Sequence, residues 1–120
     1  MINSIQNFQR PFFVGIAGSG MSAIAQYLRG TGKDVSGSDR FFAPGTYNET
    51  QEKLEAEGIP CFVQNGEGIS DKTDLVVVST AIEDTVLEVQ KAKQLGIPIM
   101  KRSELLAMIA ASKKTIAVGG

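Results

Sequence analysis

The sequence predicts an α/β fold in which a five-stranded parallel sheet of Rossmann-like order 3-2-1-4-5 is flanked by helices. Three observations carry this prediction. Short apolar runs alternate with helix-like segments, and the connections between them are short. The run Leu75–Val78 contains no polar residue, which is typical of a strand buried on both faces. A glycine-rich turn, Gly15–Gly20, directly follows the first apolar run.

The N-terminal part of the chain predicts two strands and the helix between them. Phe12–Ile16 is a short apolar run of strand type. Within Met21–Leu28 the apolar residues recur at helical spacing, and Gly30 offers a stop for this helix. Asp34–Gly37 predicts the second strand, which leads into Ser38–Asp39.

The middle of the chain predicts a polar helix and two further strands. Thr50–Glu57 is mostly polar and is followed by Gly58, so we expect a short, solvated helix. Ile59–Val63 predicts the third strand, with Pro60 near its start, where a missing N–H is tolerated. Asp74–Ser79 has the strongest strand signal in the chain and predicts the fourth strand.

The C-terminal part predicts two helices and two strands. Thr85–Leu95 predicts a helix that ends at Gly96, and Ile97–Met100 predicts the fifth strand. Ser103–Ala111 carries four large apolar side chains and predicts a closing helix. The apolar segment Thr115–Val118 predicts the start of a sixth strand.

The composition limits the classes of function. The chain has 120 residues, of which 42% are hydrophobic and 21% charged, and its formal net charge is -1. These values are typical of one globular domain and exclude a strongly basic nucleic-acid-binding protein. No apolar run reaches the roughly 18 residues of a membrane span. The polar N-terminus lacks the apolar stretch of a signal peptide.

The cysteine and histidine content narrows the chemistry further. The single cysteine, Cys61, cannot form an internal disulfide, so the reducing cytoplasm is the expected compartment. The chain has no histidine, which excludes histidine-based acid–base catalysis and histidine metal ligands in these residues. We interpret Cys61 as a strand residue rather than a nucleophile. No catalytic residue and no metal ligand is expected here.

The turn from Gly15 to Met21 reads G-I-A-G-S-G-M and is the first candidate site. Glycines let the backbone approach a phosphate closely, and the helix that follows offers unpaired N–H groups and the positive end of its dipole. The fingerprint G-x-G-x-x-G is met at Gly15 and Gly20, but Ala17 stands at its middle position. Two interpretations stay open: a diphosphate-binding turn, or a tight turn that serves helix–sheet packing.

Other polar positions fall at the carboxyl ends of predicted strands, where ligands bind in such sheets. Asp39 follows Gly20 by 19 residues and either binds a ribose or base edge or caps a turn. Ser79–Ile82 ends the fourth strand and either approaches a ligand or caps a helix. Arg102 could contact a phosphate or sugar, whereas Glu104 suits the first turn of the closing helix.

Taken together, several segments resemble the N-terminal domain of the Mur ligases. The segments are F-V-G-I-A-G-S-G-M-S-A-I-A from Phe13, V-S-G-S-D from Val35, E-G-I from Glu57, D-L-V-V-V-S-T-A-I from Asp74, G-I-P-I-M-K-R-S-E-L-L-A from Gly96 and the terminal T-I-A-V-G-G. They occur in the order of the family and cover the chain from about Phe12 onward. The turn departs from the family pattern at Ala17, where glycine is usual, and a positive φ would be costly for alanine.

The resemblance implies a cytoplasmic ligase of peptidoglycan precursor synthesis. In such an enzyme ATP, with magnesium, would phosphorylate the carboxylate of UDP-N-acetylmuramate, and the amine of alanine would attack the acyl phosphate. This domain would hold the UDP part of the sugar nucleotide, with no cofactor of its own. Its partners would be the remaining ligase domains, with no nucleic acid and no membrane. The murein-tripeptide ligases share much of the pattern, but the G-S-G-M-S turn favours the alanine-adding members.

Carried over by position, the resemblance gives the turn a diphosphate-binding role through backbone N–H groups and gives Asp39 a uridine contact. The expected substrate-binding residues are Ala17, Gly18, Ser19, Gly20, Met21, Ser38, Asp39, Arg40, Ser79, Thr80, Ala81, Ile82, Arg102 and Glu104. The adjacent Phe41 and Phe42 either stack on uracil or pack the loop. Two rival classes remain: a nicotinamide-nucleotide domain, which would prefer glycine at position 17, and a non-catalytic interaction domain.

The resemblance also implies a division into domains. Residues 1–11 would be an N-terminal extension, 12–112 the UDP-sugar-binding domain, and 113–120 the start of a central ATPase domain. In the family the strand that matches Thr115–Val118 leads into a Gly-Lys-Thr/Ser phosphate-binding loop, whereas this chain stops at Gly119–Gly120. We therefore expect an N-terminal domain that does not ligate by itself.

Overall fold

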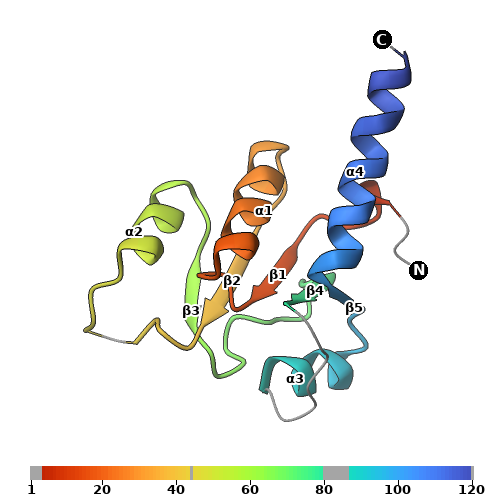
Figure 1. The fold of residues 1–120 in the computed structure, drawn as a ribbon. Helices are drawn as coiled ribbons and strands as arrows, with labels where there is room; N and C mark the ends of the chain where they lie inside the picture. Colours follow the sequence, from red (N-terminus) through yellow and green to blue (C-terminus); the bar gives the residue numbers. More distant parts are fainter. Residues whose placement is uncertain (1–3, 44, 80–86, 120) are drawn as a thin grey trace.

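The computed structural model describes residues 4–43, 45–79 and 87–119 and contains one parallel sheet (Figure 1). The strands lie in the order β3-β2-β1-β4-β5, and every neighbouring pair is parallel. Their bounds are Pro11–Val14 (β1), Ser36–Asp39 (β2), Cys61–Val63 (β3), Leu75–Val78 (β4) and Ile99–Lys101 (β5). The predicted fold class and strand order are confirmed.

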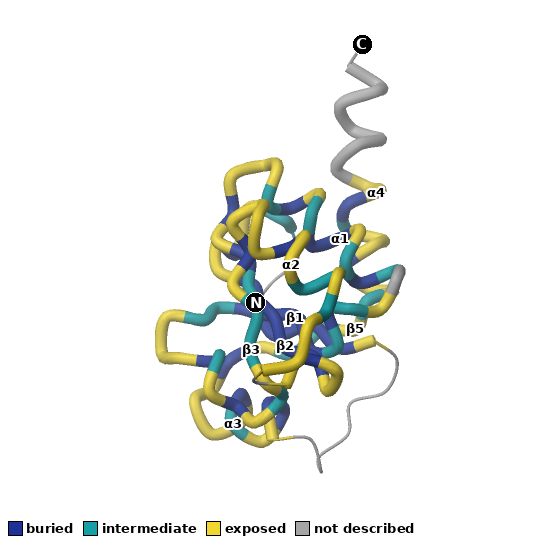
Figure 2. The backbone as a smooth tube through the Cα atoms, turned by 90° about the vertical axis from the view of Figure 1, so that its left-hand side faces the viewer, coloured by how far each residue is buried: buried dark blue, intermediate teal, exposed yellow. Residues whose placement is uncertain are grey.

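Helices cover both faces of this sheet. Their bounds are Ser19–Gly30 (α1), Glu49–Ala56 (α2), Leu87–Leu95 (α3) and Arg102–Gly119 (α4). α1, α2 and α4 lie on one face, and α3 lies on the other (Figure 1). The strands between these layers hold much of the buried chain (Figure 2).

The central strands show why the sheet forms. Phe12 and Phe13 of β1 are both fully buried, and because successive side chains alternate, they enter different core clusters. All four residues of β4 are buried, as the unbroken apolar run predicts. On the larger core, Ile24 of α1 and Leu105 of α4 belong to the same cluster, so these two helices pack on one face.

The segment before β1 takes part in the fold. A short 3-10 helix, η1, spans Ile5–Asn7, and Phe8 is buried in the larger core. The Lys33 Nζ donates a hydrogen bond to the Phe8 carbonyl (2.8 Å) and lies 4.6 Å from the centre of the Phe8 ring. The residues expected as an N-terminal extension therefore supply a core side chain and, at Pro11, the first residue of β1.

The predicted sixth strand over Thr115–Val118 is wrong, because α4 continues through these residues to Gly119. A strand needs a neighbouring strand for its backbone hydrogen bonds, whereas a helix that has already begun satisfies them along its own axis. Strand propensity therefore depends on context more than helix propensity does.

The register brings the polar positions to one edge. Ser38 pairs with Val14, and Lys101 pairs with Val78, so the chain leaves β1, β2, β4 and β5 on the same side of the sheet. The strand order reverses between β1 and β4. In open parallel sheets, ligands bind outside the carboxyl ends of the strands at such a point.

Candidate functional site

The glycine-rich turn after β1 is anchored to β2 by backbone hydrogen bonds. The N–H groups of Gly15 and Ile16 both donate to the Ser38 carbonyl, at 2.8 and 2.9 Å. Gly15 has a φ of 80°, a conformation that suits glycine. Gly18 then donates to the Gly15 carbonyl at 3.1 Å and precedes the first residue of α1. The turn therefore passes from strand to helix within a few residues and stays next to β2.

Ala17 fits this turn without backbone strain. None of the described non-glycine residues has a positive φ, so position 17 does not need glycine's freedom. The Ala17 N–H donates to the Asp39 Oδ2 at 3.0 Å. This N–H group is therefore directed at a carboxylate of the protein itself, and the expected diphosphate contacts fall on the residues that follow.

Asp39 is the polar centre of this edge. Its side chain is 5% exposed, and its second oxygen, Oδ1, accepts a hydrogen bond from the Phe41 N–H at 3.0 Å. The Asp39 carbonyl accepts a further bond from the Phe42 N–H at 3.0 Å. One carboxylate thus connects the end of β2, the loop after it and the glycine-rich turn. The structural role that the sequence left open for Asp39 is present, and its uridine contact stays a prediction.

The start of α1 lies under the side chain of Arg102. The N-cap residue, Gly18, provides no side-chain hydrogen bond, and the geometry of a helix leaves its first N–H groups without intrahelical acceptors. A Cβ atom at Gly20 would contact the Arg102 guanidinium, with Cζ at 3.3 Å and Cδ at 3.5 Å. The structure thereby brings together two predicted site residues that are far apart in sequence.

The charges of the α1 N-terminus and of the Arg102 guanidinium favour an anion between them. A cation at a helix N-terminus is next to the positive end of the helix dipole, which is unfavourable unless a negative charge lies between them. Arg102 makes no ion pair with a carboxylate of the described residues. Guanidinium groups and helix N-termini both bind phosphates well. The arrangement can therefore hold a phosphate group.

The residues at the end of β2 and directly after it divide into a buried and an exposed part. The Ser38 side chain is fully buried, and its Oγ makes no hydrogen bond with the described residues, so Ser38 acts here through its carbonyl. Phe42 is 2% exposed and belongs to the larger core, which settles its role as packing. Phe41 is 60% exposed, and the Arg40 guanidinium carbon lies 5.1 Å from the centre of its ring. Only Phe41 can therefore present a flat aromatic face to a base.

The remaining predicted residues lie at the same edge or outside the described part. Ser79 is exposed after β4, whereas Thr80, Ala81 and Ile82 lie outside the described residues. The Glu104 carboxylate accepts a hydrogen bond from the Lys101 N–H at 3.0 Å, so it caps the start of α4. Met21 is 2% exposed and its side chain packs in the larger core, so only its backbone can take part in the turn.

Sequence reasoning missed one structural determinant of this site, Gly37 in the middle of β2. A Cβ there would lie 2.6 Å from Ile16 Cδ1 and 2.7 Å from the Phe13 carbonyl oxygen. Real Cβ atoms essentially never come so close, so only glycine lets β2 lie against the end of β1. A glycine inside a predicted strand is the signal that could have indicated such a close approach.

Cys61 is not an activated thiol. Burial raises its pKa to about 12, and the negative charges of Glu55 and Asp39 add to the effect. Its Sγ lies 3.5 Å from the Ile59 carbonyl oxygen. The raised pKa favours the neutral thiol and agrees with the interpretation of Cys61 as a strand residue.

We expect Cys61 in the folded chain to react with iodoacetamide at pH 8 at least about a hundredfold more slowly than in the urea-unfolded chain, because only the thiolate attacks. Because the folded pKa lies above the unfolded one, this thiol's contribution to stability is full below the unfolded pKa and is lost as pH rises toward 12. Mass spectrometry of quenched time points measures the rates. Equal rates in folded and unfolded chains would contradict the assignment.

The described part of the chain has neither a membrane-spanning helix nor a metal-binding cluster. No described helix is long and apolar enough to cross a membrane. Within the same part of the chain, no group of three or more cysteine, aspartate and glutamate side chains could hold a metal ion.

Two curated proteins of similar sequence share one name. The chain is 46% identical over 109 residues to the UDP-N-acetylmuramate–L-alanine ligase of Carboxydothermus hydrogenoformans, a match that covers 90% of this chain and 22% of the relative. It is 40% identical over 112 residues to the protein of the same name from Streptomyces avermitilis, covering 92% and 23%. The chain thus spans about a fifth of the length of these relatives.

Solved structures and a family model agree with these relatives. The UDP-N-acetylmuramate-alanine ligase of Thermotoga maritima matches with a TM-score of 0.74 and 31% identity over 88% of this chain and 23% of that one. A ligase described as UDP-N-acetylmuramate:L-alanyl-gamma-D-glutamyl-meso-diaminopimelate ligase, from Neisseria meningitidis, matches with a TM-score of 0.65 and 25% identity, over 79% and 29%. The model of the Mur ligase family, catalytic domain, matches residues 12–114, which is most of the chain. The family model, the similar sequences and the shared fold together show that the chain belongs to the Mur ligase family.

Proposed function

We propose that this chain is the domain that binds UDP-N-acetylmuramate in a ligase of peptidoglycan precursor synthesis. The observation that carries the proposal is the Arg102 guanidinium over Gly20 at the start of α1. The helix N-terminus and the guanidinium would together hold the diphosphate. The names of the relatives support the choice of UDP-N-acetylmuramate over other diphosphates.

The rest of the site has roles that follow from its geometry. Gly18, Ser19 and Gly20 would offer backbone N–H groups to the diphosphate. Asp39 would orient the turn through the Ala17 N–H, and its remaining lone pairs would accept from the uridine. Phe41 and Arg40 would form the exposed wall beside the base. Ser79 and the residues after it would line the sugar side.

In the whole protein, we infer that ATP with magnesium activates the muramate carboxylate and that L-alanine is the amine that attacks it. These steps would take place in other domains, so this chain would bind substrate without turning it over. Residues 113–120 would then lead toward the ATPase domain. The choice of alanine rests on the names of the relatives.

A second member of the family is the alternative. The likeness to the ligase from Neisseria meningitidis favours a domain that holds a UDP-sugar peptide product, in a ligase that adds a peptide. Both members would place the diphosphate on the same turn. A nicotinamide-nucleotide domain would place a diphosphate there as well, so binding measurements must separate the bases.

We expect calorimetric titration to show saturable binding of UDP-N-acetylmuramate and none of NAD. Arg102→Gln should weaken the UDP-sugar about tenfold, because it removes one charged contact to the diphosphate. Lys101→Gln is the matched control, since it removes a neighbouring exposed charge that does not lie over Gly20. Binding of NAD alone, or equal loss in both variants, would contradict the proposal.

A further inference from the structure

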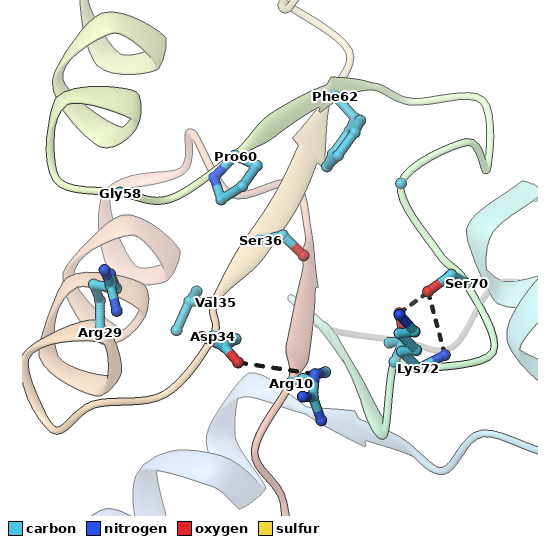
Figure 3. A pocket seen from close by; sticks show the side chains of 12 residues that line it. Arg10, Arg29, Asp34, Val35, Ser36, Gly58, Pro60, Phe62, Ser70 and Lys72 are labelled. Atoms are coloured by element: carbon cyan, nitrogen blue, oxygen red, sulfur yellow. Dashed lines mark hydrogen bonds and ion pairs between the residues drawn. The ribbon is translucent and has the colours of Figure 1, made fainter.

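A cavity of about 340 Å³ opens at the edge of the sheet opposite the glycine-rich turn (Figure 3). It is lined by Ser36 at the start of β2, by Pro60 before β3 and by Ser70 from the connection between β3 and β4. None of the expected substrate-binding residues lines it. The cavity is therefore separate from the site described above.

The connection between β3 and β4 explains the cavity. In parallel sheets a crossover is usually a helix, but residues 64–74 contain neither helix nor strand. On this face α3 contributes Val89 and Ala92 to the smaller core, together with side chains of β1 and β4. β2 instead presents Ser36, which lies in register with Phe12. The face of β2 thus lacks a helix, and the turns leave a hollow beside it.

Positive charge is concentrated around this hollow. Arg10, Arg29 and Lys72 line it with one carboxylate, Asp34, so the lining carries two more positive than negative charges, whereas the whole chain carries -1. The Asp34 carboxylate lies 3.8 Å from Arg10, and both side chains are more than half exposed. An exposed pair of this kind is weak. Arg29 and Lys72 have no ion-pair partner in the described part of the chain.

The Arg29 guanidinium is held in place by carbonyl groups. Its Nε donates to the Glu57 carbonyl at 3.2 Å and its Nη1 to the Lys33 carbonyl at 3.5 Å. These bonds use two of the five N–H donors of a guanidinium and leave its charge uncompensated by any carboxylate of the described residues. Its positive charge is therefore fixed at the rim of the cavity, across β2 from Lys72 (Figure 3).

An apolar wall completes the cavity. Phe62 lines it and packs against Phe12, with ring centres 6.3 Å apart. Gly68 lets the connection pass close to both rings, since a Cβ there would lie 2.7 Å from Phe62 Cδ2 and 2.9 Å from Phe12 Cζ. A cationic rim with an aromatic wall suits a ligand that has both an anionic and an apolar part.

We propose that this cavity is a second ligand site, which binds a small organic phosphate. The phosphate would lie between Arg10 and Lys72, and the apolar part would extend along β2 toward Phe62. Arg29 lies across β2 from Lys72 (Figure 3) and would add attraction at longer range. A dianionic phosphate matches the excess of two positive charges, which a single carboxylate would leave half compensated. The proposal is independent of the function proposed for the opposite edge.

Phenyl phosphate is a suitable probe, with phenol as the uncharged control. In nitrogen-labelled chain, titration should shift the backbone amide signals of Ser36, Gly68 and Thr73 along saturable curves. Lys72→Gln and Arg10→Gln should each weaken the affinity about fivefold, and added salt should weaken it further. Lys53→Gln, on α2 and away from the cavity, removes the same charge and should leave the affinity unchanged.

Three results would overturn the proposal. Shifts confined to Gly18–Gly20 would place the phosphate at the opposite edge. Equal shifts with phenol would show that the cations do not contribute. Equal weakening in Lys53→Gln would show attraction by overall charge rather than by a site. Lys72 is exposed, so its variant should keep the native spectrum, and the comparison stays interpretable.

Discussion

Gly37→Ala should lower the free energy of unfolding by about 3 kcal/mol, the upper end of the usual cost of overpacking. The added methyl would lie 2.6 Å from Ile16 Cδ1 and 2.7 Å from the Phe13 carbonyl oxygen. The carbonyl belongs to β1 and cannot move without disturbing the central pairing of the sheet. For a domain of this size the midpoint of thermal unfolding should fall by about 10 °C or more.

Gly30→Ala is the matched control for this variant. Gly30 is the last residue of α1, and a Cβ there would meet nothing within 4 Å. Because alanine is the better helix former, this change should stabilise the chain by up to about 1 kcal/mol. Urea unfolding followed by circular dichroism measures both variants. Equal stability of the two alanine variants would show that β2 does not depend on a close approach at Gly37.

Asp39→Ala should also cost about 3 kcal/mol of stability. The carboxylate accepts two backbone hydrogen bonds, from Ala17 and Phe41, each at 3.0 Å. Bonds to a charged group contribute about 1.5–3 kcal/mol each, and their loss leaves N–H groups unpaired at a largely buried position. The glycine-rich turn would lose its connection to the end of β2. We therefore expect UDP-sugar affinity to fall together with stability.

Asp34→Ala separates this effect from the loss of a negative charge. Asp34 is exposed and makes one ion pair, at 3.8 Å, so its removal should change stability by less than about 0.5 kcal/mol. Amide hydrogen exchange adds a local readout. Exchange at Ala17 and Phe41 should quicken in Asp39→Ala and stay unchanged in Asp34→Ala. Unaltered protection of both amides in Asp39→Ala would refute the assigned role.

The sequence predicted the five strands of the sheet because their signals are local, and their order followed from the usual topology of alternating strands and helices. The apolar runs at β1 and β4, the helical spacing of α1 and the glycines after the helices each depend on neighbouring residues. The one wrong element, the strand over Thr115–Val118, failed for the complementary reason. Whether an apolar segment becomes a strand depends on a partner that a local pattern does not contain.

The candidate site likewise has features that the sequence predicted and contacts that only the structure shows. The position of the glycine-rich turn and of Asp39 at strand ends could be read from spacing and topology. Two contacts join residues that are remote in sequence. The Asp39 carboxylate accepts a hydrogen bond from the Ala17 N–H, 22 positions earlier, and Arg102 lies over Gly20. The first contact depends on the pairing of β1 with β2 and the second on the packing of α1 and α4 on one face, and no sequence spacing specifies either.

Most of the strands and helices could thus be predicted from the chain alone, because periodicity and glycine placement are local properties. The edge where polar residues gather then followed from the usual topology of alternating strands and helices. The tertiary structure alone decided which of Phe41 and Phe42 is buried, why Ala17 is tolerated, and where the cationic cavity lies. These features arise from distances between segments that are remote in sequence, and such distances exist only once the sheet and its helices have packed together.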